Sequence, residues 1–271
     1  MSVNQTIVDP TAGYDDPRRG PAPADGCRER RCDGQANGPE SGAYREWTPP
    51  GELAGRVSRL WSREAWAPGV ARVVPDGCID LIWGPDGPIV AGPDTKAHLT
   101  VLRPQDRYFG IRFRPGALGG LLGVPPHELR DLRVPLEDLP ALPGLTREGM
   151  IDAVVARLRE TPGPDPAGAA IVAALRRGTS VAAVAWELGM SERSLHRRCL
   201  RVFGYGPKTL QRVMRFRLAL RLARSGVPLA EVAAEAGYAD QAHLANDVRR
   251  LAGVSLTRLI EPGPAGPGTW R

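Results

Sequence analysis

The sequence predicts an α+β fold, with a β-rich N-terminal domain followed by an all-α C-terminal domain. The first observation is a series of short apolar runs between residues 71 and 113, separated by Pro, Gly and Asp. Such runs are typical of a small barrel or sandwich rather than a parallel sheet. The second is a pair of similar helix–Gly–helix patterns near the C-terminus. We therefore expect a small β-barrel-like domain with flanking helices, and a helical domain with two helix-turn-helix motifs joined by a linker helix.

Composition divides the 271 residues into five segments. Residues 1–45 contain too few apolar side chains to offset the entropy of an ordered chain, so we expect disorder there. The segment 161–166 is rich in Pro and Gly, which is typical of a linker. We therefore place the N-terminal domain at 46–160, the C-terminal domain at 167–260 and a frayed tail at 261–271.

Apolar side chains recur at helical spacing from Leu53 to Trp61 and predict a short helix there. Further helices are predicted at 117–122, 125–129 and 146–159, the second of them with prolines at its start. Five strands are predicted, at 71–74, 79–83, 89–91, 98–102 and 108–113.

The two C-terminal patterns, VAWELGMS from Val184 and VAAEAGYA from Val232, share one skeleton. In each, a short apolar-faced helix ends at a glycine, Gly189 or Gly237, which can adopt the left-handed conformation that turns the chain. A second amphipathic segment follows. In a helix-turn-helix this second helix enters the DNA major groove, so the pair of motifs indicates a DNA-reading domain.

The second helix of the first motif has a predicted N-cap at Ser191. Its buried stripe comprises Leu195, Cys199 and Val202. The side chains left on its outer faces are Arg193, His196, Arg197 and Arg201. Arg193, His196 and Arg197 share one side of the helix and can point together into a groove, where arginine binds guanine bidentately. The alternative is that they are solvated surface side chains.

In the second motif the buried stripe comprises Leu244, Val248 and Leu251. The outward or intermediate side chains are Gln241, Ala242, His243, Ala245, Asn246, Arg249 and Arg250. Gln241 and Asn246 suit adenine, and the two arginines suit phosphates. His243 is equally well explained as a packed histidine. Asp247 weakens DNA binding unless it faces the protein or accepts a hydrogen bond from a cytosine amine, so we expect the second motif to be the weaker reader.

One uninterrupted helix is predicted between the motifs, at 210–223. At 1.5 Å per residue it is roughly 20 Å long. It would hold the two reading helices at a fixed separation, suited to successive major grooves about 34 Å apart.

Charge is unevenly distributed along the chain. The segment 167–260 contains 15 Lys and Arg against 6 Asp and Glu, whereas the whole chain carries a net +6. The remainder is therefore slightly acidic, at −3. This asymmetry is expected when one domain meets a phosphate backbone, although a GC-rich genome would also enrich arginine.

The sequence contains no signals typical of a membrane protein, a secreted protein, a metalloprotein or an enzyme. No apolar run approaches the roughly 18 residues of a membrane span, and the N-terminus has no signal-peptide core, so we expect a soluble cytoplasmic protein. The cysteines, Cys27, Cys32, Cys78 and Cys199, lack C-x-x-C spacing, and we expect no metal and no cofactor. Because no nucleophile-elbow, P-loop or paired-carboxylate motif is present, we expect no enzymatic activity.

Residues 169–259 resemble the DNA-binding domain of the AraC/XylS family of bacterial transcriptional regulators. The matching marks are Val184-Ala185-x-x-Leu188-Gly189-Met190-Ser191-x-x-x-Leu195, Gly204-x-x-Pro207, Val232-Ala233-x-x-Ala236-Gly237-Tyr238 and Asp240-Gln241. The resemblance implies base contacts by Arg193, His196 and Arg197 in the first reader, and by Gln241, Ala242, His243 and Asn246 in the second. The sequence departs from the family at Cys199, Leu244 and Val248, where Phe is usual, and at Leu256, where Pro is common.

The N-terminal domain resembles the effector domains of that family. The run from Gly110 to Ala117 is similar to the end of such domains, and PDGCIDLI from Pro75 is similar to the start of a poorly characterised subgroup. Strand alternation puts Cys78 and Asp80 on one face. With Trp83 they are our candidate ligand-binding residues, although the favoured interpretation of Cys78 is a small buried hydrophobe.

Three functions remain open at this point. The first is a transcription regulator whose N-terminal domain binds a small-molecule effector. The second is a DNA-binding regulator without a ligand, whose N-terminal domain serves dimerisation or protein contacts. The third is a suicidal DNA-alkyl transfer enzyme, which needs a cluster of zinc-bound thiolates that these cysteines do not supply. As partners we expect double-stranded DNA, an effector, RNA polymerase and a second copy of the chain, and no membrane.

Overall fold

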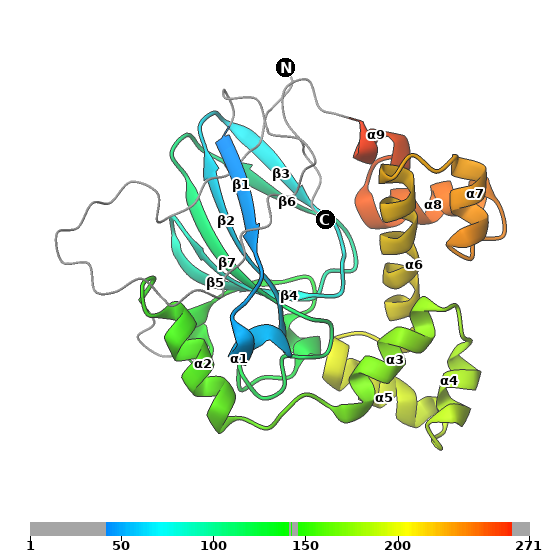
Figure 1. The fold of residues 1–271 in the computed structure, drawn as a ribbon, viewed down its shortest axis with the longest axis horizontal. Helices are drawn as coiled ribbons and strands as arrows, with labels where there is room; N and C mark the ends of the chain where they lie inside the picture. Colours follow the sequence, from blue (N-terminus) through cyan, green and yellow to red (C-terminus); the bar gives the residue numbers. More distant parts are fainter. Residues whose placement is uncertain (1–41, 141, 143–145, 262–271) are drawn as a thin grey trace.

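The structure, a computed structural model, describes residues 42–140, 142 and 146–261 (Figure 1). It confirms the predicted α+β fold, since strands fill the N-terminal part and helices form a separate lobe beside it. The predictions for residues 1–41 and 262–271, including Cys27 and Cys32, lie outside the described residues. Of the predicted disordered tail, however, residues 42–45 belong to the first strand, so the domain begins earlier than we predicted.

The N-terminal domain contains two antiparallel sheets. The larger has the order β1 (Gly42–Trp47), β2 (Val57–Ala65), β7 (Arg107–Phe113), β4 (Ile79–Gly84), β5 (Gly87–Ala91) and β8 (Arg133–Pro135). The smaller pairs β3 (Gly69–Val73) with β6 (His98–Leu102). The arrangement is barrel-like, but it consists of two separate sheets rather than one closed ring. All five predicted strands are present; β1, β2 and β8 were not predicted.

The outer face of the larger sheet carries the main core of this domain. Helix α1 (Gly51–Ala54), helix α2 (Met150–Glu160) and the turns near Leu121 cover it. Two short 3-10 helices, η1 (Pro126–Leu129) and η2 (Leu136–Asp138), flank β8. This face is filled by packed aliphatic side chains.

Two helix predictions in this domain are wrong. The segment from Leu53 to Trp61 forms one helical turn followed by β2. Since β2 is buried on both faces, its consecutive apolar residues gave an apparent helical spacing. The segment 117–122 forms turns, because Gly119 adopts a left-handed conformation (φ 59°) within it. The helix predicted at 146–159 begins only at Met150, and that at 125–129 is η1.

The C-terminal domain contains seven helices among the described residues. They are α3 (Pro166–Arg176), α4 (Val181–Glu187), α5 (Glu192–Phe203), α6 (Pro207–Arg224), α7 (Leu229–Glu235), α8 (Gln241–Ala252) and α9 (Leu256–Ile260). Helix α6 runs through the middle of the lobe, with α4 and α5 at one end and α7 and α8 at the other (Figure 1). The predicted linker helix is therefore confirmed. No described helix has the length and apolar character needed to cross a bilayer.

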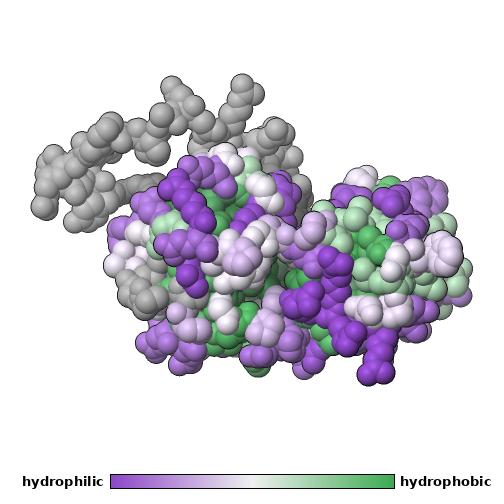
Figure 2. Space-filling model, turned by 90° about the horizontal axis from the view of Figure 1, so that it is seen from below, coloured by the Kyte–Doolittle hydropathy of each residue, from purple (hydrophilic) through white to green (hydrophobic). Residues whose placement is uncertain are grey.

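The two lobes are in direct contact. Val74 is part of the same buried cluster as the helices of the C-terminal domain. Arg72 Nη1 donates a hydrogen bond to the carbonyl of Ala252 at 2.8 Å, and Gly77 lies against the end of the Met214 side chain. Figure 2 shows hydrophilic side chains along the junction of the lobes, beside small apolar areas.

Candidate nucleic-acid interface and cavity

The first helix-turn-helix motif consists of α4 and α5. Gly189 between them has a φ of 63°, the left-handed conformation that the sequence predicts. The hydroxyl of Ser191 accepts a hydrogen bond from the amide of Ser194 at 3.2 Å and caps α5. The predicted stripe, Leu195, Cys199 and Val202, is buried against the neighbouring helices. The recognition helix is thereby fixed by its caps and its core face, which leaves the opposite face free.

All four predicted contact residues of α5 are exposed to solvent: Arg193, His196, Arg197 and Arg201. They divide between two sides of the helix. Arg193 and His196 line a hollow beside α6, whereas the Arg201 guanidinium lies 3.9 Å from Asp165 at the start of α3. Arg201 is therefore set apart from Arg193 and His196.

The second motif consists of α7 and α8, with Gly237 (φ 75°) in the turn. Asp240 caps α8 by accepting a hydrogen bond from the amide of His243 at 2.7 Å. The predicted contact residues are all exposed: Gln241, Ala242, His243, Asn246, Arg249 and Arg250. The His243 ring, however, accepts a hydrogen bond from the Ala239 amide at 3.3 Å and packs edge-on against Tyr238. This geometry favours the packed alternative for His243.

Asp247 faces the protein, so it does not oppose phosphate binding as a solvent-facing carboxylate would. Its oxygens lie 3.2 Å from Arg212 and 3.7 Å from Arg215, both on α6. The Arg215 guanidinium also lies over the Tyr238 ring, 4.8 Å from its centroid. The second motif is thus fastened to the linker helix by ion pairs and a cation–π contact. Because α6 has 18 residues, about 27 Å at 1.5 Å per residue, it separates the two helix-turn-helix motifs by one continuous helix.

A cavity of about 320 Å³ lies between the two sheets of the N-terminal domain, and we name it the sheet cavity. Its volume lies at the lower end of the usual range for small-molecule sites. Asp80 and Ile82 of β4 line it, together with Cys78 directly before that strand, as the predicted alternation requires. Trp83 does not: it lies on the other face of β4 and packs against the main core of the domain, so it leaves our candidate site.

Buried charges converge on the wall of the sheet cavity. Asp80 accepts hydrogen bonds from Trp61 Nε1 at 2.7 Å and from Arg112 Nε at 3.1 Å. Burial raises the pKa of the Asp80 carboxyl, and the charge of Arg112 opposes that shift. The pKa of Arg112 is raised because the charges of Asp80 and Asp76 outweigh its burial. A buried pair of this kind is costly unless its hydrogen bonds are complete, and it holds polar groups in fixed positions.

A second ion pair lines the same cavity. Arg133 donates two hydrogen bonds to Asp94, at 2.9 and 2.7 Å. Nearby, burial lowers the pKa of His98, so its imidazole is neutral at pH 7. Sequence reasoning missed Trp61, Arg112, Asp94 and Arg133. The signal for Arg112 was available, since a charged residue stands within the apolar run YFGIRF of β7.

The comparison with family models decides the nature of the C-terminal domain. Residues 184–261 match the model of a helix-turn-helix domain, over the two motifs described above. The C-terminal domain is an AraC-type helix-turn-helix domain. Residues 45–135 match a domain of unknown function, DUF6597. No curated protein sequence matches the chain. These matches support a DNA-binding regulator of transcription, in which an AraC-type domain follows a sheet domain of undefined role.

The chain also resembles solved structures of ToxT from Vibrio cholerae. A ToxT variant in its apo form is 11% identical, with 74% of this chain and 96% of that chain covered and a TM-score of 0.41. Wild-type ToxT with a bound unsaturated fatty acid is 8% identical, with 74% and 93% covered and a TM-score of 0.39.

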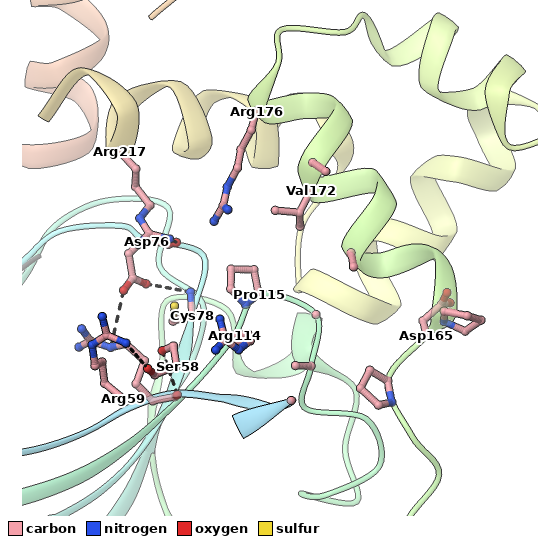
Figure 3. Close-up of a pocket in the computed structure, with 18 of the residues that line it drawn as sticks. Ser58, Arg59, Asp76, Cys78, Arg114, Pro115, Asp165, Val172, Arg176 and Arg217 are labelled. Atoms are coloured by element: carbon pink, nitrogen blue, oxygen red, sulfur yellow. Dashed lines mark hydrogen bonds and ion pairs between the residues drawn. The ribbon is translucent and has the colours of Figure 1, made fainter. Parts of the chain in front are cut away.

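A cleft of about 680 Å³ lies between the sheet domain and the AraC-type domain, and we name it the interdomain cleft (Figure 3). Arg176 of α3 and Arg217 of α6 extend into it from one side, and Asp76, Cys78 and Pro115 face them from the other. Asp76, Cys78 and Arg112 line both this cleft and the sheet cavity. The turn that carries Asp76 is therefore a wall shared by the two spaces.

Cys78 has the properties of a buried structural thiol. Burial, together with the charge of Asp76, raises its pKa well above the ordinary value, so the group remains protonated. A protonated thiol is a poor nucleophile and a poor metal ligand. Among the described residues, no cluster of three or more His, Cys, Asp or Glu side chains is arranged to hold a metal ion.

Proposed function

We propose that the protein reads two successive major grooves with α5 and α8, and that a small molecule bound in the sheet cavity controls this reading. The observation that carries the first part is the single helix α6, which holds two capped helices with exposed polar faces at a fixed separation. Arg193, Arg197, Gln241 and Asn246 are the proposed base-contacting residues. Arg249 and Arg250 are the proposed phosphate contacts.

The sheet cavity supports the second part. It combines an apolar lining with the fixed polar groups of Asp80, Arg112, Asp94 and Arg133 and with the aromatic ring of Trp61. A few placed polar groups in an apolar pocket are typical of small-molecule sites. Cys78 lines the cavity but supplies no reactive group, because its thiol remains protonated. The cavity shares a wall with the interdomain cleft, which gives a bound molecule a physical connection to the AraC-type domain.

One observation favours the alternative, a regulator without a ligand. Leu99 and Val101 on β6 are 51% and 68% exposed, on the outer face of the small sheet. Exposed apolar side chains on a sheet of two strands suit a contact with another chain, including a second copy of this one. In that case the N-terminal domain would act as the dimerisation module.

A protection footprint on the region upstream of the protein's own gene tests the reading mechanism. Two protected patches per protomer, about one helical turn apart, are expected. A single patch would show that the second motif does not enter its groove. The absence of any protected patch would contradict the proposal that the protein reads DNA. Thermal melting with a panel of metabolites tests the effector. A raised melting temperature with one compound, lost in Asp80→Asn, supports the cavity, whereas no response together with a dimer that Val101→Lys disrupts supports the alternative.

A further inference from the structure

The sheet domain contributes to the surface that the two reading helices present. A hollow of about 840 Å³ lies beside α5 and the start of α6, and we name it the basic hollow. The C-terminal domain supplies Arg193, His196, Lys208, Arg212 and Arg250 to its lining, and the sheet domain supplies Thr95, Lys96 and Arg130. Arg193, which is proposed to read bases, and residues of the sheet domain therefore line one continuous surface.

The charge of the basic hollow is strongly positive. Six of its lining residues are Lys or Arg, and the one acidic lining residue is Glu192. Arg212 lies 3.2 Å from the Asp247 carboxylate, which compensates that one charge. Lys96 and Arg130 are exposed to solvent. A concave surface of one charge sign concentrates ions of the opposite sign, here anions.

A local clamp brings the two sheet-domain cations together. The carboxylate of Asp131 accepts hydrogen bonds from the Thr95 amide and from the Thr95 hydroxyl, both at 2.7 Å. Lys96 and Arg130 are the sequence neighbours of these two bonded residues, so the clamp holds their backbones side by side. It also occupies the Asp131 carboxylate, the acidic group next to Arg130 in sequence; Asp94, the acidic group nearest to Lys96 in sequence, is paired with Arg133.

This corner of the sheet domain, residues 93–96 and 126–131, is packed against the end of α5. Gly204 follows α5 in a left-handed conformation (φ 82°), and a Cβ there would lie 2.4 Å from Pro93 and 2.9 Å from the carbonyl oxygen of Pro126. Only the absence of a side chain allows this approach. Pro93 precedes the clamp, and Pro126 begins η1, the helix that leads to Arg130. The two cations are thereby placed at a fixed position relative to the first recognition helix.

Duplex geometry identifies the anion that suits this position. A protein that reads two successive major grooves on one face of DNA spans the minor groove between them, where the phosphates of both strands lie. Protein surface between the two reading helices therefore faces phosphate backbone. The basic hollow begins at Arg193 and His196 on α5 and reaches Arg250 on α8, which is that intervening surface.

We infer that Lys96 and Arg130 contact the DNA phosphate backbone between the two major grooves, so that the sheet domain is a third DNA-binding element. The inference rests on the DNA reading proposed above. It adds that the regulatory domain binds the same duplex as the recognition helices, through contacts that carry no base information. These contacts increase affinity for every sequence and leave the choice of sequence to α5 and α8.

Salt dependence of binding by the full-length protein tests this inference, because each phosphate contact adds about 0.9 to the slope of log Kobs against log salt. The variants are Lys96→Gln and Arg130→Gln, measured with a fluorescent duplex of mixed sequence by anisotropy over a salt series. Arg103→Gln is the matched control, since Arg103 is an exposed arginine of the same domain that does not line the hollow. Circular dichroism melts confirm that each variant is folded.

The expected result is a slope lower by about one for each of the two variants and unchanged for the control. Equal slopes for Lys96→Gln, Arg130→Gln and Arg103→Gln, in a wild-type protein that binds DNA with steep salt dependence, would overturn the inference and leave the proposed function intact. Tighter binding by the two variants would also overturn it, because the corner would then obstruct the duplex. If the wild-type protein does not bind DNA at all, both the inference and the proposed function are wrong.

Discussion

Arg217 on the linker helix donates a hydrogen bond from Nη1 to the backbone carbonyl of Asp76 at 2.9 Å, across the boundary between the two domains. The bond joins α6, the helix between the two helix-turn-helix motifs, to the turn that lines the sheet cavity. A hydrogen bond from a charged donor typically contributes about 1.5–3 kcal/mol, and less where solvent competes. The contact therefore fixes one domain relative to the other.

We predict that Arg217→Met lowers the free energy of unfolding by about 1 kcal/mol, because the apolar stem is kept and only the bond to Asp76 is lost. Urea denaturation followed by circular dichroism measures the change. Arg221→Met is the control, one turn further along α6 and exposed. An equal loss in both variants would show that charge alone, and not the interdomain bond, is responsible.

Arg193→Ala and Arg197→Ala should each weaken binding to the footprinted site by about 1–3 kcal/mol, with a much smaller effect on random DNA. Both side chains are exposed on α5, and a bidentate contact to guanine is lost only where that base is present. Titrations on both duplexes at one salt concentration measure the difference. Equal losses on the two duplexes would identify these arginines as phosphate contacts.

Asp165 should stabilise the protein in a pH-dependent way. Hydrogen bonds from Arg198, at 2.8 and 2.6 Å, lower the pKa of its carboxyl. The hydrogen bond that the Ala167 amide donates to Asp165, which caps α3, lowers this pKa further. Since the folded-state pKa lies below the unfolded one, the stabilisation is complete above the unfolded value, about 3.9, and is lost as pH falls through the lower folded value.

Asp165→Asn, which can still cap α3, should therefore be less stable than the wild type by about 0.5–1 kcal/mol at pH 7. The difference should shrink below about pH 4 and vanish under more acidic conditions. Urea denaturation at pH 7, 5 and 3 provides the measurement. A difference that stays constant down to pH 3 would mean that the charge of Asp165 plays no part.

The domain boundary that the sequence predicts can be tested with fragments. A fragment from Pro164 onward should fold alone, because all buried residues of its core cluster except Val74 belong to the C-terminal domain. It should bind DNA with steep salt dependence. The complementary fragment should begin at Gly42, so that β1 is kept, and end at 160; it should fold without shifting DNA in a gel. An unfolded C-terminal fragment, by circular dichroism, would place the boundary elsewhere.

The helical domain could be predicted almost completely, because its signals are local. Gly189 and Gly237 mark the turns, Ser191 caps α5, and the apolar stripe repeats with the helical period. The sequence could not predict which residue forms an ion pair with each charged side chain. Asp247 seemed a difficulty for DNA binding until its contacts with α6 were known. Ion pairs between elements distant in sequence leave no local pattern.

The sheet domain was predicted less well, for a related reason. A strand buried on both faces, such as β2, has no alternation of polar and apolar residues, so its period could not be recognised. Alternation along β4 and the residue before it did place Cys78 and Asp80 on the cavity side, and the same rule places Trp83 on the other face. The position of Arg133 depends on β8 pairing with β5, a long-range contact that three residues of sequence cannot reveal.

The wall shared by the sheet cavity and the interdomain cleft has a thermodynamic consequence. If a molecule in the cavity shifts Asp76, Cys78 or Arg112, it acts on residues that also face α3 and α6. Linkage then requires reciprocity: the factor by which the ligand changes DNA affinity equals the factor by which DNA changes ligand affinity. A protein already seated on its operator would therefore respond to a different effector concentration from one free in solution, and the promoter itself would help to set the threshold of the response.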